Sequence, residues 1–211
     1  MTAEVVVAGE RLILRADRSL YWPRTGSLVV TDLHFGKADA FRARGVPVPG
    51  GPQGALDRLT AALAETAARR LVILGDFWHD RIGVTEKLLQ TLAEWRSSHL
   101  ALSVEMVVGN HDRVEPPPDW GAWCDRLVEP PFVMTHYPNR TPEHYVLSGH
   151  IHPGVRLGGR GRERLVLPCF RFGDRVGLLP AFGEMTGLHA MRPRRGEKLY
   201  AIAGPQVIEV S

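Results

Sequence analysis

Five predicted strands of this chain each end in a turn that carries aspartate, asparagine or histidine. Asp32, Asp76 and Asn110 follow three of these strands, and His136 and His150 follow the other two. In α/β proteins the carboxyl ends of strands lie along one edge of a sheet, where loops converge to form sites. The pattern therefore favours an α/β fold in which these side chains share one crevice.

The order of the apolar segments supports this fold class. Short apolar or alternating runs at residues 4–8, 11–14, 19–22 and 27–31 are typical of antiparallel strands joined by turns. Farther along the chain, apolar residues at helical spacing alternate with short apolar strands, which predicts repeated strand-helix-strand units. The elements expected there are helices around 56–67 and 88–95, strands at 71–74, 104–108, 132–135, 145–147, 198–203 and 206–210, and irregular loops at 45–54, 115–120 and 158–164.

Length and composition favour one globular unit. The chain has 211 residues, 44% of them apolar, so we expect residues 1–211 to form a single domain with a substantial core. No apolar run approaches the roughly 20 residues of a spanning helix, and the chain opens without a basic and apolar leader. We therefore expect a soluble, cytoplasmic protein without a membrane partner, and the oligomeric state stays open.

Cysteine content and net charge constrain the function only weakly. Cys124 and Cys169 lack the number and the spacing of a disulfide scaffold or a zinc knuckle, so we expect both to be packing residues. The net charge of +3 permits a phosphate-bearing partner but does not by itself indicate nucleic acid. The positions of the charges matter more than their sum.

The first two polar motifs have ordinary explanations when each is taken alone. Asp32 and His34 are two residues apart, so in extended backbone both side chains would point to the same face and hold one ion. Such a pair also arises by chance. Asp76 follows a buried apolar strand, where a divalent cation would compensate its charge, although an N-cap is the simpler explanation in isolation.

The later motifs are more specific. Asn110 and His111 supply an amide oxygen and an imidazole after a glycine, although an incidental polar turn has the same composition. His150 and His152 suit two adjacent ions, two ligands of one ion, or a pair of core histidines. Coincidence explains the ordered set poorly, so the residues predict a metal centre. Its candidate ligands are Asp32, His34, Asp76, Asn110, His136, His150 and His152.

This ordered set resembles that of the calcineurin-like metallophosphoesterases, over residues 32–152. The resemblance implies an α/β/β/α sandwich of four layers, in which two mixed sheets are flanked by helices. It also implies two metal ions that share Asp76. The implied ligands are Asp32, His34, Asp76 and His152 for one ion, and Asp76, Asn110, His136 and His150 for the other.

The resemblance further implies catalytic roles for two histidines. His111 is at the position that faces the phosphate and stabilises the developing charge or protonates the leaving oxygen. His79 lies three residues after Asp76, a spacing that resembles repair nucleases of the Mre-eleven type. The mixed oxygen and nitrogen ligands suit manganese, iron or zinc, and the family favours manganese. Two such ions would activate a bridging hydroxide for in-line attack on a phosphodiester.

A closer resemblance extends over nearly the whole chain. Residues 32–37, 41–49, 149–155 and 167–170 are similar to the DNA-ligase-associated metallophosphoesterases of bacteria. That resemblance implies a manganese-dependent endonuclease for single-stranded DNA that acts in DNA repair. It also implies a functional association with a DNA ligase, a helicase and a nuclease. Tyr137 follows His136 where many family members have glycine, and this bulkier residue could shape the mouth of the site.

Basic side chains beside the motifs are candidate contacts for the phosphates of a strand. Lys37 and Arg42 follow the first metal motif, and Arg160 and Arg162 follow the last. A solvated charged loop is an equally good explanation of the second pair. A third basic cluster, Arg192, Arg194, Arg195 and Lys198, has a placement that the sequence does not fix.

Aromatic residues and rival functions complete the interpretation. Phe35, Phe77 and Trp78 are close enough in sequence to the motifs to stack on bases, or they belong to the core. The main rival is a small-molecule phosphodiesterase or pyrophosphatase that acts on nucleotides or sugar nucleotides. A remote rival is a non-enzymatic protein-binding scaffold, which the complete ligand set disfavours.

Overall fold

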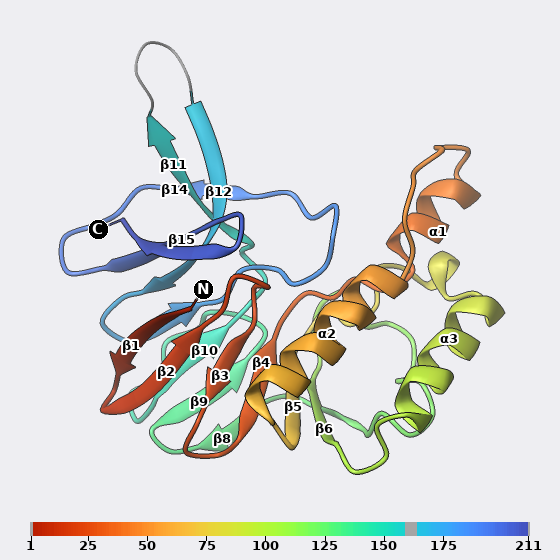
Figure 1. Ribbon diagram of the computed structural model, residues 1–211, viewed down its shortest axis with the longest axis horizontal. Helices are drawn as coiled ribbons and strands as arrows, with labels where there is room; N and C mark the ends of the chain where they lie inside the picture. Colours follow the sequence, from red (N-terminus) through yellow and green to blue (C-terminus); the bar gives the residue numbers. More distant parts are fainter. Residues whose placement is uncertain (1, 159–163, 211) are drawn as a thin grey trace.

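The computed structural model describes residues 2–158 and 164–210. Arg160 and Arg162, two of the predicted substrate contacts, lie outside the described residues. Figure 1 shows two sheets that face each other, with the helices gathered beside the first of them. No described helix is long and apolar enough to cross a lipid bilayer.

The first sheet has the strand order β1-β2-β3-β4-β5-β6-β7. Strands β1 to β4 pair antiparallel, as the short runs predict, and β4 to β7 pair in parallel. Tight turns suffice for the antiparallel pairs, whereas helices connect β4 to β5 and β5 to β6 because parallel neighbours need a long crossover. The strands are β1 (Ala3–Val7), β2 (Glu10–Leu14), β3 (Leu20–Trp22), β4 (Ser27–Val30), β5 (Arg70–Leu74), β6 (Ser103–Val107) and β7 (Trp123–Cys124).

Strands β4 and β5 are buried on both faces. Val29 and Val72 pack in the core between the two sheets, while Leu28 and Leu71 pack in the core beneath the helices. A parallel strand covered on both sides is apolar at successive positions, which is why these segments show no alternation. The polar residues that follow them therefore emerge from a rigid, buried support.

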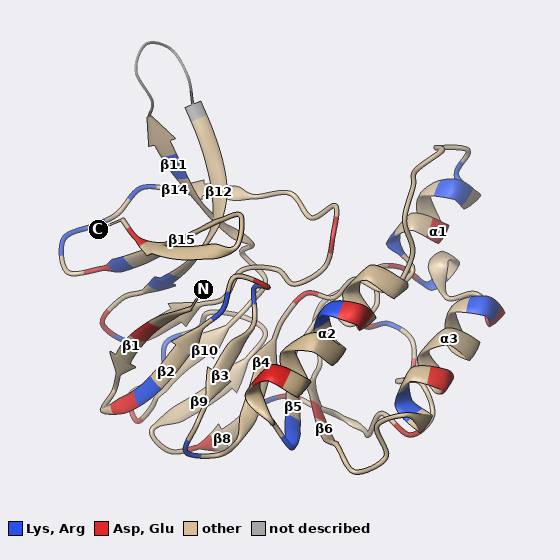
Figure 2. Cartoon of the chain, viewed as in Figure 1, with Lys and Arg blue, Asp and Glu red and all other residues tan. Residues whose placement is uncertain are grey.

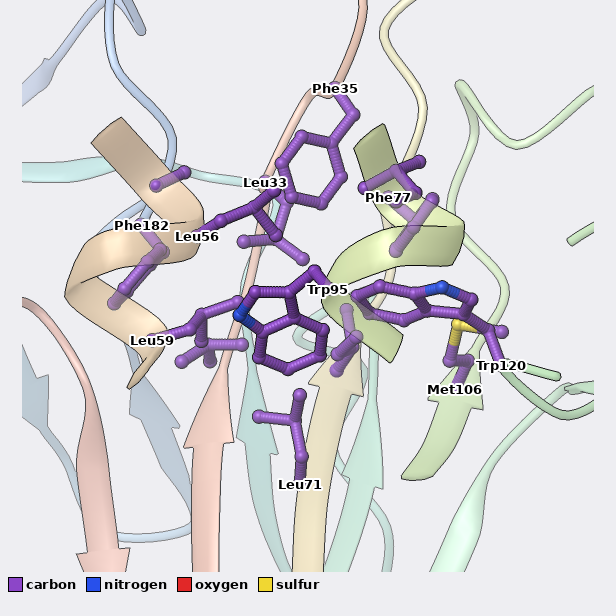
Figure 3. Close-up of a cluster of buried hydrophobic side chains, with 14 of the residues drawn as sticks. Leu33, Phe35, Leu56, Leu59, Leu71, Phe77, Trp95, Met106, Trp120 and Phe182 are labelled. Atoms are coloured by element: carbon purple, nitrogen blue, oxygen red, sulfur yellow. The ribbon is translucent and has the colours of Figure 1, made fainter. Parts of the chain in front are cut away.

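Helices α2 (Gln53–Thr66) and α3 (Glu86–Ser97) cover the outer face of the first sheet. Leu56, Leu59 and Leu63 lie on the buried face of α2, as their spacing predicts. Helix α3 contributes Trp95, whose ring stacks on that of Trp120 with centroids 5.1 Å apart (Figure 3). The two helices fix the outer side of the sheet on which the site is built.

The second sheet supplies the remaining site residues. Its order is β14-β11-β12-β13-β10-β9-β8, and β15 pairs with β12 and with β16. β10 is parallel to β9 and β13, while β11 and β12 form an antiparallel hairpin. The strands are β8 (Leu127–Glu129), β9 (Phe132–Thr135), β10 (Tyr145–Ser148), β11 (Pro153–Gly158), β12 (Arg164–Phe172), β13 (Val176–Leu178), β14 (His189–Met191), β15 (Lys198–Ala203) and β16 (Gln206–Glu209).

Apolar side chains from both sheets meet in one layer. Phe132 and Phe170 of the second sheet join Trp22 and Leu74 of the first in this core. The two mixed sheets confirm the predicted α/β fold. In the described part of the chain, the outer face of the second sheet carries a small apolar cluster around Cys169 instead of a helix.

Several regions differ from the sequence-based expectation, among them the short strands β7, β8, β13 and β14, which were not predicted. The short helix α1 (Lys37–Ala43) was not predicted, because its seven residues show no extended apolar periodicity. The long strands β11 and β12 were not predicted either, because Pro153, Gly154 and Pro168 interrupt their apolar pattern. Gly154 and Pro168 nonetheless lie opposite each other in the ladder.

Candidate metal centre

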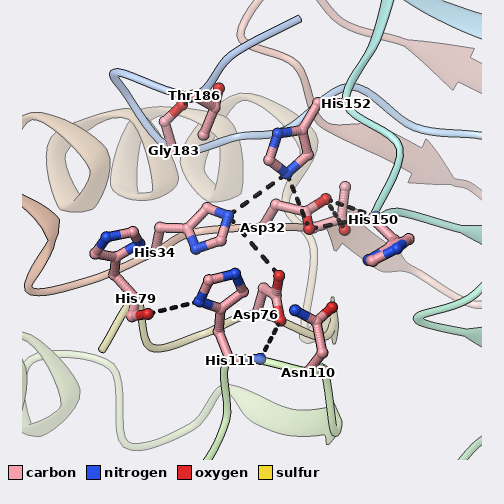
Figure 4. Close-up of polar contacts among 12 residues, drawn as sticks. Asp32, His34, Asp76, His79, Asn110, His111, His150, His152, Gly183 and Thr186 are labelled. Carbon is pink, nitrogen blue, oxygen red and sulfur yellow. Dashed lines mark hydrogen bonds and ion pairs between the residues drawn. The ribbon is translucent and has the colours of Figure 1, made fainter. Parts of the chain in front are cut away.

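The seven candidate ligands lie in turns that follow five neighbouring strands. Asp32 and His34 follow β4, Asp76 follows β5, and Asn110 follows β6 of the first sheet. His136 follows β9 of the second sheet, and His150 and His152 follow β10. Because all five strands point their carboxyl ends to the same edge, the turns meet there (Figure 4).

Backbone hydrogen bonds hold the turns after β4 and β5 together. The backbone nitrogen of Asp32 donates to the carbonyl of Gly75 at 3.0 Å, and the backbone nitrogen of His34 donates to the backbone carbonyl of Asp76 at 2.9 Å. The backbone nitrogen of Phe35 then donates to the backbone carbonyl of Phe77 at 2.8 Å. The ladder between these strands thus continues into the site and fixes the relative positions of the two aspartates.

Three glycines leave room for site residues from other strands. A Cβ on Gly75 would collide with the His136 ring, and a Cβ on Gly109 would collide with Asp76. A Cβ on Gly149 would collide with Thr31 and Asp32. The glycines that precede Asp76, Asn110 and His150 in the motifs therefore serve close packing between ligand turns.

Five of the seven candidate ligands have left-handed backbone. The φ angles are 52° at Asp32, 49° at His34, 51° at Asp76, 66° at His150 and 50° at His152. This conformation costs about 1–2 kcal/mol per non-glycine residue, and strain of this kind concentrates at functional sites. The side chains of Asp32 and His34 converge, as expected. The expected cause, an extended backbone, is wrong, because both residues have left-handed backbone.

Asp32, His34 and His152 form the first cluster of candidate ligand atoms, all within 4.8 Å of one another. Nε2 of His152 lies 3.3 Å from Oδ1 of Asp32, and 3.5 Å from Nε2 of His34. Asp32 is fully buried and His34 nearly so. The cluster offers one carboxylate and two imidazoles to a single point.

Asp76, His136 and His150 form the second cluster within the same 4.8 Å limit. Nε2 of His136 lies 3.5 Å from Oδ1 of Asp76, 3.1 Å from Nδ1 of His150 and 3.0 Å from Oδ1 of Asn110. His150 and His152, two residues apart, thus belong to different clusters. Among the alternatives for this pair, the structure favours two adjacent sites over a shared ligand role or plain core packing.

Main-chain carbonyls set the tautomers of two imidazoles. Nδ1 of His136 donates to the carbonyl of Leu74 at 3.0 Å, and Nδ1 of His152 donates to that of Gly187 at 3.2 Å. Because each ring then carries its proton on Nδ1, its Nε2 keeps a lone pair, and this lone pair points into the cluster to which the histidine belongs. Ligand histidines in metalloproteins are oriented by this kind of bond.

The chemistry of the donor set fits divalent cations. Burial lowers the pKa of His34 to about 3, so this imidazole is neutral and able to donate a lone pair at ordinary pH. Its Nδ1 is buried and has no hydrogen-bond partner among the described residues. Burial raises the pKa of Asp76, and the nearby Asp32 carboxylate raises it further. A bound cation would offset the charge of both carboxylates.

His111 and His79 lie next to the clusters. Nδ1 of His111 donates to the carbonyl of His79 at 2.7 Å, and the two rings stack with centroids 5.5 Å apart. The His79 ring also stacks on Phe41 of α1 at 6.1 Å. Burial lowers the pKa of His79 to about 4, which makes its ring neutral at physiological pH. The structure therefore brings both predicted catalytic histidines to the site.

Comparisons with known proteins agree with this geometry. The family model of the calcineurin-like phosphoesterases matches residues 27–140, more than half of the chain. The chain belongs to the calcineurin-like phosphoesterase family. It is similar over its whole length to the nuclease MPE of Pseudomonas putida, with 36% identity, a TM-score of 0.86 and 100% of both chains covered. The resemblance inferred from the motifs is confirmed, and the protein is a metal-dependent phosphoesterase.

More distant comparisons add little to this assignment. A phosphoesterase from E. coli, Yfce, has 14% identity and a TM-score of 0.42, with 87% of this chain and 97% of that chain covered. The comparison with curated proteins gives no match. Family membership therefore rests on the family model and on the Pseudomonas structure.

The phosphoesterase site contains supporting residues that the sequence did not single out. Asp112 accepts hydrogen bonds from the backbone nitrogens of Trp78 and Gly109, at 2.9 and 2.7 Å, and so joins the turns after β5 and β6. Thr31 donates to Asp32 at 2.6 Å. Asp112 had a sequence signal, since it directly follows Gly109, Asn110 and His111 in the polar turn after β6, whereas Thr31 had none.

The predicted substrate contacts have different placements. Lys37 is half-buried and lines a pocket of about 260 Å³ that also includes His34, and burial lowers its pKa. Arg42 donates to the carbonyls of Val48 and Gly50, so it braces the irregular loop after α1, and its contact with substrate remains only a prediction.

The aromatic residues next to the motifs belong to the core. Phe35, Phe77 and Trp78 are at most 3% exposed and pack beneath α2 and α3. Of the two alternatives for these rings, core packing is therefore correct, because rings this deeply buried offer no surface on which bases could stack. Their burial explains how the turns around the ligands are held rigid.

Proposed function

We propose that this phosphoesterase is a two-metal phosphodiesterase that cuts single-stranded DNA, with manganese as its metal and residues 1–211 as one functional domain. One relationship carries the proposal: the two oxygens of Asp76 face different clusters. Oδ2 lies 3.9 Å from Nε2 of His34, and Oδ1 lies 3.5 Å from Nε2 of His136. This is the arrangement expected of a carboxylate shared by two ions.

The chain's own residues divide the work in a simple way. Asp32, His34 and His152 would hold one ion, and Asn110, His136 and His150 the other, with Asp76 between them. Two bound divalent ions would supply an activated water and neutralise charge on the phosphate. The stack of His111 on His79 holds the His111 ring beside His34 of the first cluster, and the backbone nitrogen of His111 donates to Oδ1 of Asp76. There the ring would stabilise the phosphate or donate a proton to the leaving oxygen.

Two observations support a nucleic-acid substrate. The similar structure that spans the whole chain is described as a nuclease. Lys37 forms no ion pair within the described part of the chain, although it is half-buried in a pocket beside His34. A half-buried cation without an anionic partner is suited to a phosphate group. A role in DNA repair alongside a ligase, a helicase and a nuclease remains a prediction, as does the cytoplasmic location.

A metal-dependent activity screen tests the proposal. The purified protein is stripped with EDTA and supplied in turn with manganese, iron, zinc and magnesium. It is then incubated with single-stranded DNA, duplex DNA, cyclic nucleotides and sugar nucleotides. We expect cleavage of internal phosphodiesters of single-stranded DNA, fastest with manganese. Faster turnover of cyclic or sugar nucleotides would favour the small-molecule alternative, and failure of every metal to restore activity would contradict the metal mechanism.

A further inference from the structure

The third basic cluster of the sequence lies beside the candidate metal centre. β14 pairs in parallel with β11, and the backbone nitrogen of His189 donates to the carbonyl of His152 at 2.9 Å. The segment that carries Arg192, Arg194 and Arg195 is therefore anchored to a candidate metal ligand. In Figure 2 the stretch between β14 and β15 carries the blue of Lys and Arg.

A groove of about 500 Å³ runs along this segment. Its lining includes Pro138 and Ile151, which adjoin candidate ligands in the chain, so the groove lies next to the turns that carry the second cluster. Four arginines line it, and three of them are exposed: Arg140, Arg194 and Arg195. We call these three the groove arginines.

The groove has an excess of positive charge. Arg171 also lines it, but this guanidinium is bonded to the Glu197 carboxylate through two nitrogens. Within the described residues, none of the groove arginines forms an ion pair, and all three are exposed. Asp174 is the other acidic side chain of the lining. An array of unpaired guanidinium groups is suited to successive phosphates.

An exposed aromatic ring lies between the groove and the clusters. Tyr137 is 42% exposed, and its ring centroid is 4.7 Å from that of His150 and 5.0 Å from that of His136. The next residue, Pro138, lines the groove. Aromatic rings beside a basic groove stack on unpaired bases, which a duplex does not present.

The two depressions suit a substrate that extends in both directions. The pocket of Lys37 reaches the first cluster through His34, and the groove adjoins the second cluster through Pro138 and Ile151. An enzyme that cuts within a strand must accommodate nucleotides on both sides of the broken bond. A small nucleotide would need only one of these depressions.

We propose that this groove binds single-stranded nucleic acid, and that the strand leaves the metal centre over Tyr137 and continues along the groove arginines. The inference rests on the proposed phosphodiesterase function and adds the path of the substrate. The groove arginines are separate from the residues that would contact the phosphate being cut. The groove would therefore raise the affinity for a nucleic-acid strand without taking part in the cleavage step.

The test compares Arg194→Ala/Arg195→Ala with a control pair of equal charge loss, Arg69→Ala/Lys87→Ala. Arg69 and Lys87 are exposed and form no ion pair in the described residues. Two readouts are used for wild type and both variants: anisotropy of a labelled single-stranded oligonucleotide across a salt series, and the ratio of kcat/KM for that oligonucleotide to kcat/KM for bis(p-nitrophenyl) phosphate.

We expect Arg194→Ala/Arg195→Ala to weaken oligonucleotide binding about tenfold. The fall of log affinity with log salt should become shallower, its slope decreasing in magnitude by about 1.4. The ratio of kcat/KM values should fall by about the same factor. The control should keep the wild-type slope and ratio. Unchanged values in the groove variant, an equal loss in the control, or an equal preference for duplex would each overturn the proposed path.

The two proposals fail in different ways. If wild type cleaves bis(p-nitrophenyl) phosphate but no DNA, the proposed nuclease function fails, and anisotropy still decides whether the groove binds a strand. If wild type cleaves DNA while the groove variant matches it in both readouts, the groove inference alone fails. Thermal denaturation of each variant identifies a loss that comes from unfolding.

Discussion

The His136 ring packs directly on Gly75, at the place where any side chain on that glycine would overlap the imidazole. The ring is held there because its Nδ1 donates to the carbonyl of the preceding residue, Leu74, at 3.0 Å. A residue of the second sheet is thus positioned by a turn of the first. The glycine before Asp76 is a contact surface between the two halves of the candidate metal centre.

Gly75→Ala should therefore lower phosphodiesterase activity about hundredfold, because a displaced ligand disturbs the geometry of the site. The matched control is Gly9→Ala: Gly9 has φ 84° against 82° at Gly75, but no atom lies within 4 Å of its added Cβ. Both variants carry similar backbone strain, so turnover of an aryl diester separates crowding from strain. Equal activity in the two variants would contradict the packing argument.

Asp76→Asn should lose metal as well as activity. The substitution keeps the shape of the side chain but removes the charge that two ions would share, in a site that is 2% exposed. Metal content after dialysis, measured by mass spectrometry, should fall well below the wild-type value. Wild-type content of two ions together with wild-type turnover would rule out the bridging role.

His111→Ala should separate catalysis from metal binding. His111 is stacked on His79 and bonded to its carbonyl, and it belongs to neither of the two carboxylate-containing clusters. We expect metal content to remain at the wild-type level and kcat to fall about 10²–10⁴-fold, as is typical when a general acid is removed. Loss of metal in proportion to loss of activity would make His111 a ligand instead.

Cys169 should resist alkylation in the folded protein. Burial raises the pKa of its thiol to about 12, and the thiolate is the reactive form, so almost none of this thiol is ionised at pH 8. Burial also raises the pKa of Cys124. Iodoacetamide at pH 8 should modify neither residue until the protein is denatured, as peptide mass spectrometry will report. Rapid modification of native Cys169 would contradict its buried position.

Regular elements and the order of the ligand motifs were accessible from the sequence. The runs at residues 27–31 and 71–74 were identifiable because a strand buried on both faces is apolar at successive positions. The spacing of Leu56, Leu59 and Leu63 identified α2 because one face of that helix is buried. Local patterns of this kind depend on neighbours along the chain.

Residue spacing alone did not reveal which side chains share a cluster. Residue spacing left open whether His150 and His152 serve two adjacent ions, one ion or the core, and the family resemblance assigned them to different ions. Both residues have left-handed backbone, and they lie in different clusters. Residue spacing also did not predict where the basic cluster around Arg194 lies. Its position depends on the pairing of β14 with β11, which is set by contacts across the second sheet. Strand pairing between distant segments is decided by packing in three dimensions.

By itself, the sequence determined that the chain is an α/β metal-dependent phosphoesterase whose strand ends carry the candidate ligands, because apolar period and motif order are local properties. Only the tertiary structure decided that Asp76 faces both clusters and that Gly75 accommodates His136. It also placed Phe77 in the core and set Tyr137 beside a basic groove. Those relationships join residues from different strands, and they exist only once two sheets have packed face to face.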